Sequence, residues 1–181
     1  VDEFAGEIKL DNNLSVANLI VAADGANSAV RNKAGIGTQG WQYGQSVLSV
    51  TVQCADSNEY RDTSDMTWQA FHPTGPRAFL PMYERFASLI WYDAPQKIQQ
   101  LQNLESASLK EQIRTHFPDN LPDFTIVNTA AFPLTRMHAQ RYVQGKLALV
   151  GDSAHTINPL AGQGVNLGFK DAEALVNGLS E

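Results

Sequence analysis

The sequence is poor in cysteine and in positive charge, and each shortage argues against a class of protein. Its one cysteine, Cys54, cannot form an internal disulfide. It lies in an alternating apolar run, where a small buried thiol is expected, and this fits a reducing compartment. The 13 Lys and Arg residues are outnumbered by 19 Asp and Glu residues, which gives a net charge of −6. Because they form no basic run that would neutralise phosphates, we expect no nucleic-acid partner.

Long hydrophobic runs are also missing. The longest apolar runs fall far short of the roughly 20 residues that a membrane-spanning helix needs. The N-terminal residues lack the basic segment and apolar segment of a secretion signal. We expect a cytoplasmic protein. The sequence starts at Val1 within a strand-like pattern and stops at Glu181 directly after a helical one, so we expect an excised piece of a longer chain.

Two segments have the pattern of strands in an α/β protein. The 181 residues are 43% hydrophobic, enough for one domain or two small lobes. Leu19 to Ala23 form a continuous apolar run of the kind that is buried on both faces of a parallel sheet, and a helical pattern follows to about Lys33. Residues 146–150 predict a second such strand. Before them, residues 7–10 and 14–16 around a polar turn predict a hairpin.

The middle of the chain alternates as an antiparallel sheet does. Leu48, Val50, Val52 and Cys54 alternate with polar residues, which is the period-2 pattern of a half-buried strand. Further strands are predicted near 67–72, 77–82, 86–92 and 124–132. Residues 95–117 predict helix, with a capping box at Ser108–Glu111. The fold class predicted is α/β (α+β), with two α/β pieces at 1–36 and 137–181 enclosing an inserted sheet and helix segment at 37–136.

The closing helix is predicted to be amphipathic. Its apolar residues recur at helical spacing on one face, and they are Val165, Gly168, Phe169, Ala172, Leu175, Val176 and Leu179.

Asp152 follows the second predicted strand closely. A carboxylate there lies at the sheet edge where ligands of open α/β sheets bind, and it can accept hydrogen bonds from sugar or ribityl hydroxyls. Taken alone, Asp152 is equally well interpreted as a turn or helix-capping residue.

A glycine pair opens the closing helix. Gly162 and Gly164 flank Gln163, and free amides at a helix N-terminus attract an anion or a polarised carbonyl. A lone Gly-x-Gly is weak evidence. Here the glycine pair occurs together with a predicted strand, the acid Asp152, and Pro159, which fixes the turn. This combination indicates a bound planar or phosphorylated cofactor.

These residues carry a family resemblance. GDSAH at 151–155, Asn158-Pro159 and GQGVNLG at 162–168 resemble the second flavin-binding motif of the class A flavoprotein aromatic hydroxylases, the p-hydroxybenzoate hydroxylase type. DGANS at 24–28 with Val30-Arg31 resembles the same family's Asp-Gly motif, in the right order. The segments WQYGQS (41–46) and GPRAFLP (75–81) are closest to the ubiquinone-biosynthesis hydroxylases, in particular those of the bacterial demethoxyubiquinone type.

The resemblance implies FAD as cofactor. It implies that Asp152 binds the ribityl chain and that the amides of Gly162, Gln163, Gly164, Val165 and Asn166 face the pyrimidine edge of the isoalloxazine. There a helix N-terminus would stabilise the negative charge near N1 of the reduced ring. By the same resemblance the cofactor-binding set also includes Pro159, Asp24, Gly25 and Arg31.

The resemblance also implies a reaction and partners. NAD(P)H reduces the flavin, O₂ is activated as a flavin hydroperoxide, and a prenylated quinol or phenol of ubiquinone biosynthesis is hydroxylated. No catalytic side chain is assigned. Expected partners are this hydrophobic substrate and O₂, with a homo-oligomer and with peripheral association with the inner membrane or a biosynthetic complex as further expectations.

The N-terminal residues lack one element of that family. A dinucleotide-binding βαβ unit needs about 30 residues with G-x-G-x-x-G after its first strand. Seventeen residues precede Asn18, and none of them forms this fingerprint. We therefore expect the part that binds the ADP half of FAD to be absent, and the chain alone to be inactive.

Three alternatives stay open. A flavin-dependent hydroxylase of a soluble phenol is the nearest one. A serine esterase with Ser153 as nucleophile and His155 as base is disfavoured, because a triad needs partners from separate segments. A non-catalytic interaction module is the third, although aromatic residues at strand spacing are mostly core; those concerned are Trp41, Tyr43, Trp68, Phe71, Trp91 and Tyr92. The four histidines lack metal-ligand spacing, so no metal is expected.

Overall fold

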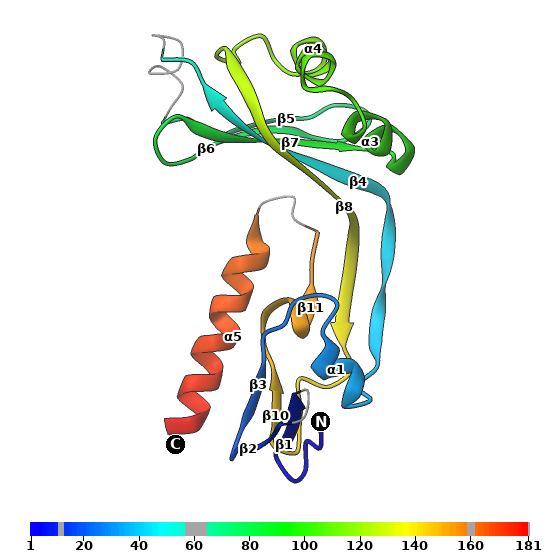
Figure 1. Cartoon of the computed structure of the whole chain (residues 1–181), viewed down its shortest axis with the longest axis vertical. Coiled ribbons are helices and arrows are strands. Elements are labelled where there is room, and N and C mark those ends of the chain that lie inside the picture. The colour runs from blue at the N-terminus through cyan, green and yellow to red at the C-terminus, as the bar shows by residue number, and fades with distance from the viewer. Residues whose placement is uncertain (11–12, 57–64, 159–161, 181) are drawn as a thin grey trace. The chain divides into compact units, whose positions relative to one another are not determined.

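The computed structural model describes residues 1–10, 13–56, 65–158 and 162–180. Their contacts divide the chain into unit 1, which combines Val1–Gln42 with Thr135–Glu181, and unit 2, Tyr43–Leu134. Strands predominate in both units and helices accompany them (Figure 1). This mixture confirms the predicted α+β fold class.

Unit 1 contains a hairpin and a small mixed sheet. Strands β1 (Glu7–Leu10) and β2 (Asn13–Val16) pair antiparallel, which confirms the predicted hairpin. The sheet has the order β3-β10-β9, formed by β3 (Ile20–Ala22), β10 (Leu147–Leu149) and β9 (Val143–Gln144). The strands β3 and β10 run parallel, as expected for an α/β piece. Their inward side chains form a core with Ala34, Ile36, Ala139 and Ala154.

The prediction that the first strand is buried on both faces is wrong at Val21. Ile20 and Ala22 are buried, whereas Val21 between them is 45% exposed. A continuous apolar run is fully buried only when both faces of its sheet are covered. Among the described residues, the face that Val21 occupies is open.

Unit 2 is built on a curled antiparallel sheet. Strand β4 (Thr38–Cys54) pairs with β7 (Phe86–Asp93), β7 with β6 (Arg77–Pro81), and β6 with β5 (Trp68–Ala70). On the other side of β4 lies β8 (Phe124–Ala139), and next to β8 lies β11 (His155–Thr156), which belongs to unit 1. Both β4 and β8 continue into unit 1. The predicted alternation is confirmed, because Leu48, Val50, Val52 and Cys54 are all buried.

Two helices cover the apolar face of this sheet. Helices α3 (Pro95–Gln102) and α4 (Ser106–His116) lie on the same side of it (Figure 1). They insert Ile98, Leu101, Leu109 and Ile113 into one core with Phe79, Leu89 and Trp91. Helix was therefore predicted correctly for most of 95–117.

The predicted capping box is wrong. Helix α4 begins at Ser106, with Glu105 as an N-cap that makes no side-chain cap bond, so Ser108 lies inside the first turn. Only three residues separate α4 from α3. The packing of Leu109 and Ile113 on the sheet, together with this short connection, sets the helix start in place of local capping chemistry.

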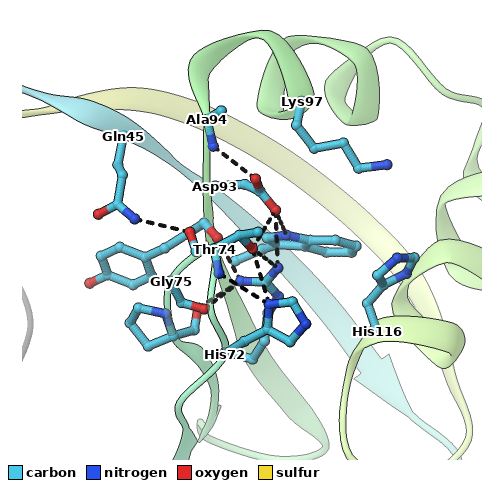
Figure 2. Close-up of polar contacts among 12 residues, drawn as sticks. Gln45, His72, Thr74, Gly75, Asp93, Ala94, Lys97 and His116 are labelled. Carbon is cyan, nitrogen blue, oxygen red and sulfur yellow. Dashed lines mark hydrogen bonds and ion pairs between the residues drawn. The ribbon is translucent and has the colours of Figure 1, made fainter.

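A polar network closes one end of the sheet (Figure 2). The Asp93 carboxylate accepts hydrogen bonds from Arg77 Nη2 at 3.1 Å, Trp91 Nε1 at 3.1 Å and Thr74 Oγ1 at 2.9 Å. The backbone N–H of Ala94 donates to the same group at 2.9 Å. Burial alone would raise the pKa of Asp93, but these hydrogen bonds and the Arg77 charge outweigh it and lower the pKa. The network thus fixes the turn that contains Thr74 to the end of β7.

The apolar face of the closing helix is exposed. Helix α5 (Gln163–Ser180) forms as expected, but no side chain in it is buried. Val165, Phe169, Val176 and Leu179 are between 61% and 68% exposed. Helical spacing predicts that these residues share a face, but only a packed neighbour can bury that face. No helix in the described part of the chain has the length and apolarity of a membrane span.

Candidate functional site

Two acidic residues follow the carboxyl ends of the two parallel strands in unit 1. Asp24 comes two residues after β3, and Asp152 comes three residues after β10. The strands are adjacent, with Ala22 opposite Leu149. Asp24 and Asp152 therefore lie at the same sheet edge, which is the edge where ligands of open α/β sheets bind.

The Asp-Gly motif forms the start of helix α1 (Ala29–Lys33). Asp24 Oδ2 accepts a hydrogen bond from Val30 N at 3.1 Å, and Ser28 Oγ accepts one from Arg31 N at 2.9 Å. Burial acts to raise the pKa of Asp24, but hydrogen bonds from Ser28 and from backbone N–H groups lower it overall. Gly25 has φ +83°, a backbone conformation that favours glycine. Asp24 is exposed and also caps the helix.

The Gly-Asp motif forms a short 3₁₀ turn, η1 (Gly151–Ser153), directly after β10. Ser153 Oγ lies 2.6 Å from Ala22 O and 2.7 Å from Val150 O, and its hydroxyl can donate to either carbonyl. Gly151 has φ +60°. These contacts fasten the turn to both parallel strands and leave Asp152 exposed at its apex.

Arg31 joins the two motifs from inside the protein. Its Nη1 donates to Ser153 O at 2.8 Å, and its Nη2 donates to Ala26 O at 2.8 Å. Only 5% of the residue is exposed, and its Nε is buried without a hydrogen-bond partner among the described residues. Arg31 was predicted among the cofactor-binding residues, and the structure uses its guanidinium to bind main-chain carbonyls.

The first turn of α5 presents backbone to open space. Gly162 has φ +63°, and a Cβ added at Gly162 or Gly164 would meet no atom within 4 Å. Gln163, Val165 and Asn166 are exposed. The first four N–H groups of a helix have no partner inside it, and no hydrogen bond joins these amides to another described part of the chain, so they can donate to a ligand. Pro159, also predicted here, lies outside the described residues.

The residues present fit a flavin. An exposed carboxylate, two glycines with free space above the backbone and the amides of a helix N-terminus together suit a molecule with hydroxyls and a polar ring edge. In addition, Asn158 Oδ1 is buried and has no hydrogen-bond partner among the described residues. An oxygen in that condition can accept a hydrogen bond from a ligand or water.

Residues 35–40 spell G-x-G-x-x-G, but the context is wrong for a dinucleotide cradle. The fingerprint requires a strand before it and a helix after it. Here the segment follows helix α1 and continues into strand β4. It therefore does not provide the helix N-terminus that would hold a pyrophosphate.

The structure overturns the serine esterase alternative. Ser153 is 0% exposed, and its hydroxyl is occupied by main-chain carbonyls. His155 Nε2 lies 2.6 Å from Asp171 Oδ2. A nucleophile must reach its substrate and contact its base, and Ser153 does neither.

Asp171 is the site residue that sequence reasoning missed. Its Oδ2 accepts hydrogen bonds from Gly151 N at 2.8 Å and from His155 Nε2 at 2.6 Å, and thereby links α5 to the Gly-Asp turn. The sequence has no local signal for this role, because Gly151 and His155 become neighbours of Asp171 only when α5 packs on the turn.

The aromatic residues divide between core and surface. Trp91 and Tyr92 are buried, Tyr43 and Trp68 are half-buried against the core, and Trp41 and Phe71 are exposed. A shallow groove of about 240 Å³ lies between α3 and β8. Enclosed ligand pockets are usually about 300–1,000 Å³, so this groove does not by itself define a ligand site.

The comparison with protein families identifies the class. The FAD binding domain family matches residues 11–181, and the chain belongs to this family. The match includes the Asp-Gly motif, the Gly-Asp turn and helix α5. It confirms the flavoprotein resemblance drawn from the motifs.

Curated relatives narrow the resemblance. The chain is 56% identical over 161 residues to the 3-demethoxyubiquinol 3-hydroxylase of Escherichia coli, covering 89% of this chain and 40% of that protein. It is 30% identical over 196 residues to the human mitochondrial ubiquinone biosynthesis monooxygenase COQ6, covering 90% of this chain and 41% of that protein. The chain thus spans about 40% of the length of these relatives.

Solved structures agree on the fold. PqsL of Pseudomonas aeruginosa, a probable FAD-dependent monooxygenase, superposes with a TM-score of 0.78 at 22% identity, covering 97% of this chain and 49% of that one. Aklavinone-11 hydroxylase, solved with FAD and aklavinone, gives a TM-score of 0.73 at 20% identity, covering 90% and 31% of the two chains. At these identities the likeness establishes the fold alone.

Proposed function

We propose that this chain supplies one side of the flavin site, and the substrate-selecting sheet, of an FAD-dependent aromatic-ring monooxygenase. In this proposal, residues 1–36 and 137–181 contact the flavin and residues 37–136 contact the substrate. The observation that carries the proposal is the exposed Asp152 at the sheet edge in the same unit as the free amides of α5. The 56% identity to a ubiquinol hydroxylase supports the choice of reaction.

Each residue of the site has a proposed role. Asp152 accepts hydrogen bonds from the ribityl hydroxyls. The N–H groups of residues 162–166 point toward the pyrimidine edge of the ring, where the helix dipole favours negative charge. Asp24 and Gly25 shape the adjacent loop, and Pro159 belongs to the segment that leads into α5. Arg31 acts by holding the two motifs together, because its guanidinium is already bonded to Ser153 O and Ala26 O.

The proposed reaction hydroxylates the aromatic ring of a prenylated quinol or phenol in ubiquinone biosynthesis. One atom of O₂ enters the ring in place of hydrogen and the other leaves as water, while NAD(P)H supplies two electrons. FAD, when bound, supplies the oxygen chemistry. The chain's own residues bind and orient the cofactor and the substrate, and no side chain has to act as a nucleophile.

The face of the unit 2 sheet opposite helices α3 and α4 supports the assignment of a hydrophobic substrate. Val47, Tyr92 and Leu134 form a small apolar cluster there, flanked by Tyr43 and Ile90. The three cluster residues are 1–4% exposed, so in this proposal the half-buried Tyr43 and Ile90 beside them contact the aromatic ring and the prenyl chain.

A hydroxyl pair on the same face supports the second candidate, a hydroxylase of a soluble phenol. Ser49 Oγ and Ser88 Oγ lie 3.2 Å apart. Hydroxyl groups in this position suit a polar ring substituent. The two candidates share the flavin site and differ only in what the sheet accepts.

The proposal includes a location and an assembly. We place the intact enzyme in the cytoplasm, as a homo-oligomer with peripheral attachment to the inner membrane or to a biosynthetic complex. The reason is that a prenylated substrate resides in the membrane. The exposed apolar residues of α5 are consistent with self-association.

Removal of the Asp152 carboxylate tests the flavin assignment. The protein to use is a hybrid in which this chain replaces the matching region of the E. coli hydroxylase. Asp152→Ala should weaken FAD binding by about 1.5–3 kcal/mol, as for a lost hydrogen bond to a charged group. This corresponds to a roughly 10- to 150-fold rise in Kd, measured by flavin fluorescence.

Asp123→Ala in unit 2 is the matched control, because Asp123 is an exposed acid bonded to Lys110 and Arg114. It should leave FAD affinity unchanged. Equal flavin content after dialysis in the unmodified and Asp152→Ala hybrids would refute the assignment.

A further inference from the structure

Asp171 connects the two halves of the candidate flavin site. Its carboxylate oxygen Oδ2 accepts the backbone N–H of Gly151 at 2.8 Å and the Nε2–H of His155 at 2.6 Å. The side chain of Asp171 is 19% exposed and that of His155 is 4% exposed, so the contact is largely shielded from water. One side chain on α5 thus binds the residue that precedes Asp152 and a residue that follows it.

A close backbone contact lies beside these hydrogen bonds. A Cβ added at Gly168 would be 3.4 Å from the Cα of Gly151. Gly168 and Asp171 are three residues apart, and residues at this spacing share a helix face. The face of α5 that meets the turn is therefore made of a glycine, which permits close approach, and an acid, which accepts the amide of Gly151.

The turn is also held from the opposite side. Ser153 Oγ reaches Ala22 O and Val150 O, and Arg31 Nη1 donates to Ser153 O. Asp152 thus lies between two anchored neighbours. Gln163, the first residue of α5, is eight residues before Asp171, which is about 12 Å along a helix that rises about 1.5 Å per residue. Asp171 therefore determines where the first-turn amides lie relative to the Asp152 carboxylate.

We propose that Asp171 is a positioning residue of the flavin site, which sets the distance between Asp152 and the N-terminal amides of α5 so that both bind one FAD molecule. This inference rests on the proposed function. Asp171 does not have to contact the cofactor. Its effect is transmitted through Gly151, His155 and the helix.

The test compares FAD dissociation constants in the hybrid defined above. Asp171→Ala removes both hydrogen bonds and should raise the Kd about tenfold or more. The Kd of the Asp171→Asn hybrid should stay within about threefold of the unmodified value. Asparagine has the same shape as aspartate, and its amide oxygen has two lone pairs for the same two donors. If the asparagine variant keeps FAD affinity and the alanine variant loses it, Asp171 acts by placing the turn and its negative charge is not required.

A double substitution tests whether Asp171 acts through Asp152. If Asp171 positions Asp152, the Asp152→Ala/Asp171→Ala hybrid should bind FAD less weakly than the product of the two single effects predicts. Independent, multiplying effects would contradict the proposal. A visible circular dichroism spectrum of bound flavin that changes in Asp171→Ala, but not in Asp171→Asn, would support it.

Glycine variants approach the same contact without removing a hydrogen-bonding group. Gly168→Val places branched methyl groups against Gly151 and should weaken FAD binding about tenfold, as the loss of Asp171 does. Gly178→Val is the matched control on the same helix, because a Cβ there meets nothing within 4 Å. It should leave the Kd unchanged. This pair keeps the proposal testable even when Asp171→Ala fails to fold.

The outcomes separate this inference from the proposed function. When Asp152→Ala weakens FAD binding but neither Asp171→Ala nor Gly168→Val does, Asp171 is not a positioning residue and the flavin assignment stands. When the unmodified hybrid and Asp152→Ala bind FAD equally, or neither binds it, the flavin assignment fails and this inference fails with it.

Discussion

Asp93 is the residue on which the polar end of the unit 2 sheet depends. It forms an ion pair with Arg77, whose side chain is 2% exposed. It also accepts hydrogen bonds from Trp91, Thr74 and the backbone N–H of Ala94. Arg77 Cζ lies 4.6 Å from the centroid of the Trp91 ring. Burial lowers the pKa of Arg77, and the Asp93 charge opposes that shift. Removing Asp93 would leave a buried guanidinium without its counter-charge.

Asp93→Asn should therefore destabilise the chain by about 3–5 kcal/mol, the usual cost of breaking a buried ion pair from one side. The pH dependence follows from the lowered pKa of Asp93. The stabilisation by the ionised carboxylate is fully present above the unfolded-state pKa and is lost as pH falls through the lower folded-state pKa. Urea unfolding from pH 7 to pH 3 should show this acid loss in the unmodified chain and a smaller one in the variant.

Asp123→Asn provides the comparison, because Asp123 is an exposed acid in two surface ion pairs. Pairs of that kind contribute about 0–1 kcal/mol. Equal unfolding free energies for Asp93→Asn and the unmodified chain would show that the pair does not stabilise unit 2.

The burial and position of single residues could be predicted from sequence where the neighbouring residues along the chain determine them. Cys54 was expected to be buried from its alternating neighbours; it is buried, and burial raises the pKa of its thiol. Asp152 was expected beside a strand end from the order of residues alone. Asp171 could not be found in this way, because its partners Gly151 and His155 become neighbours only when α5 packs on the turn.

Among the helices and strands, those strands with a clear apolar alternation were predicted, but the residues at which they begin and end were not. The alternation from Leu48 to Cys54 located β4, but the strand begins at Thr38, where the sequence has no such alternation. The capping box at Ser108 misplaced the start of α4, because packing on the sheet and the short connection to α3 set it. The apolar spacing predicted helix α5 correctly, but spacing alone does not decide whether a packed neighbour covers that face.

The inserted segment 37–136 should determine substrate choice, because its sheet bears both the apolar cluster around Tyr92 and the Ser49–Ser88 pair. Exchanging this segment in the hybrid for that of a soluble-phenol hydroxylase should change the ratio of kcat/KM for the prenylated quinol and the phenol at least about tenfold. Steady-state oxygen consumption with both substrates measures the ratio.

The paired exchange of residues 137–181 serves as the control for this prediction. It should alter FAD affinity and leave the substrate ratio unchanged. A ratio that followed 137–181 instead would move substrate selection to the flanking motifs.

At the scale of the whole chain, exposed apolar surface predicts self-association. Four large apolar residues of α5 and Val21 of β3 are exposed in unit 1, and such surface favours contacts between molecules. The 181-residue chain should therefore have a mass above 19.8 kDa by light scattering. Phe169→Lys with Val176→Lys should reduce that mass, whereas Phe71→Lys, which changes an exposed phenylalanine of unit 2, should not. A monomer in the unmodified chain would contradict this expectation.

The same chain, purified alone, should be colourless and without NAD(P)H oxidase activity. The residues described in unit 1 suit the ribityl chain and ring of FAD. The one G-x-G-x-x-G of the sequence, at 35–40, runs into strand β4 and offers no helix N-terminus to a pyrophosphate. A yellow chain with stoichiometric flavin would show that these 181 residues suffice.

A crystal structure of the hybrid with FAD tests most directly whether Asp152 and the first turn of α5 bind one flavin. A carboxylate oxygen of Asp152 should lie about 2.5–3.0 Å from a ribityl hydroxyl. The N–H groups of residues 163–166 should be directed at the pyrimidine edge of the ring. A flavin bound with Asp152 facing solvent, or with α5 away from the ring, would contradict this assignment.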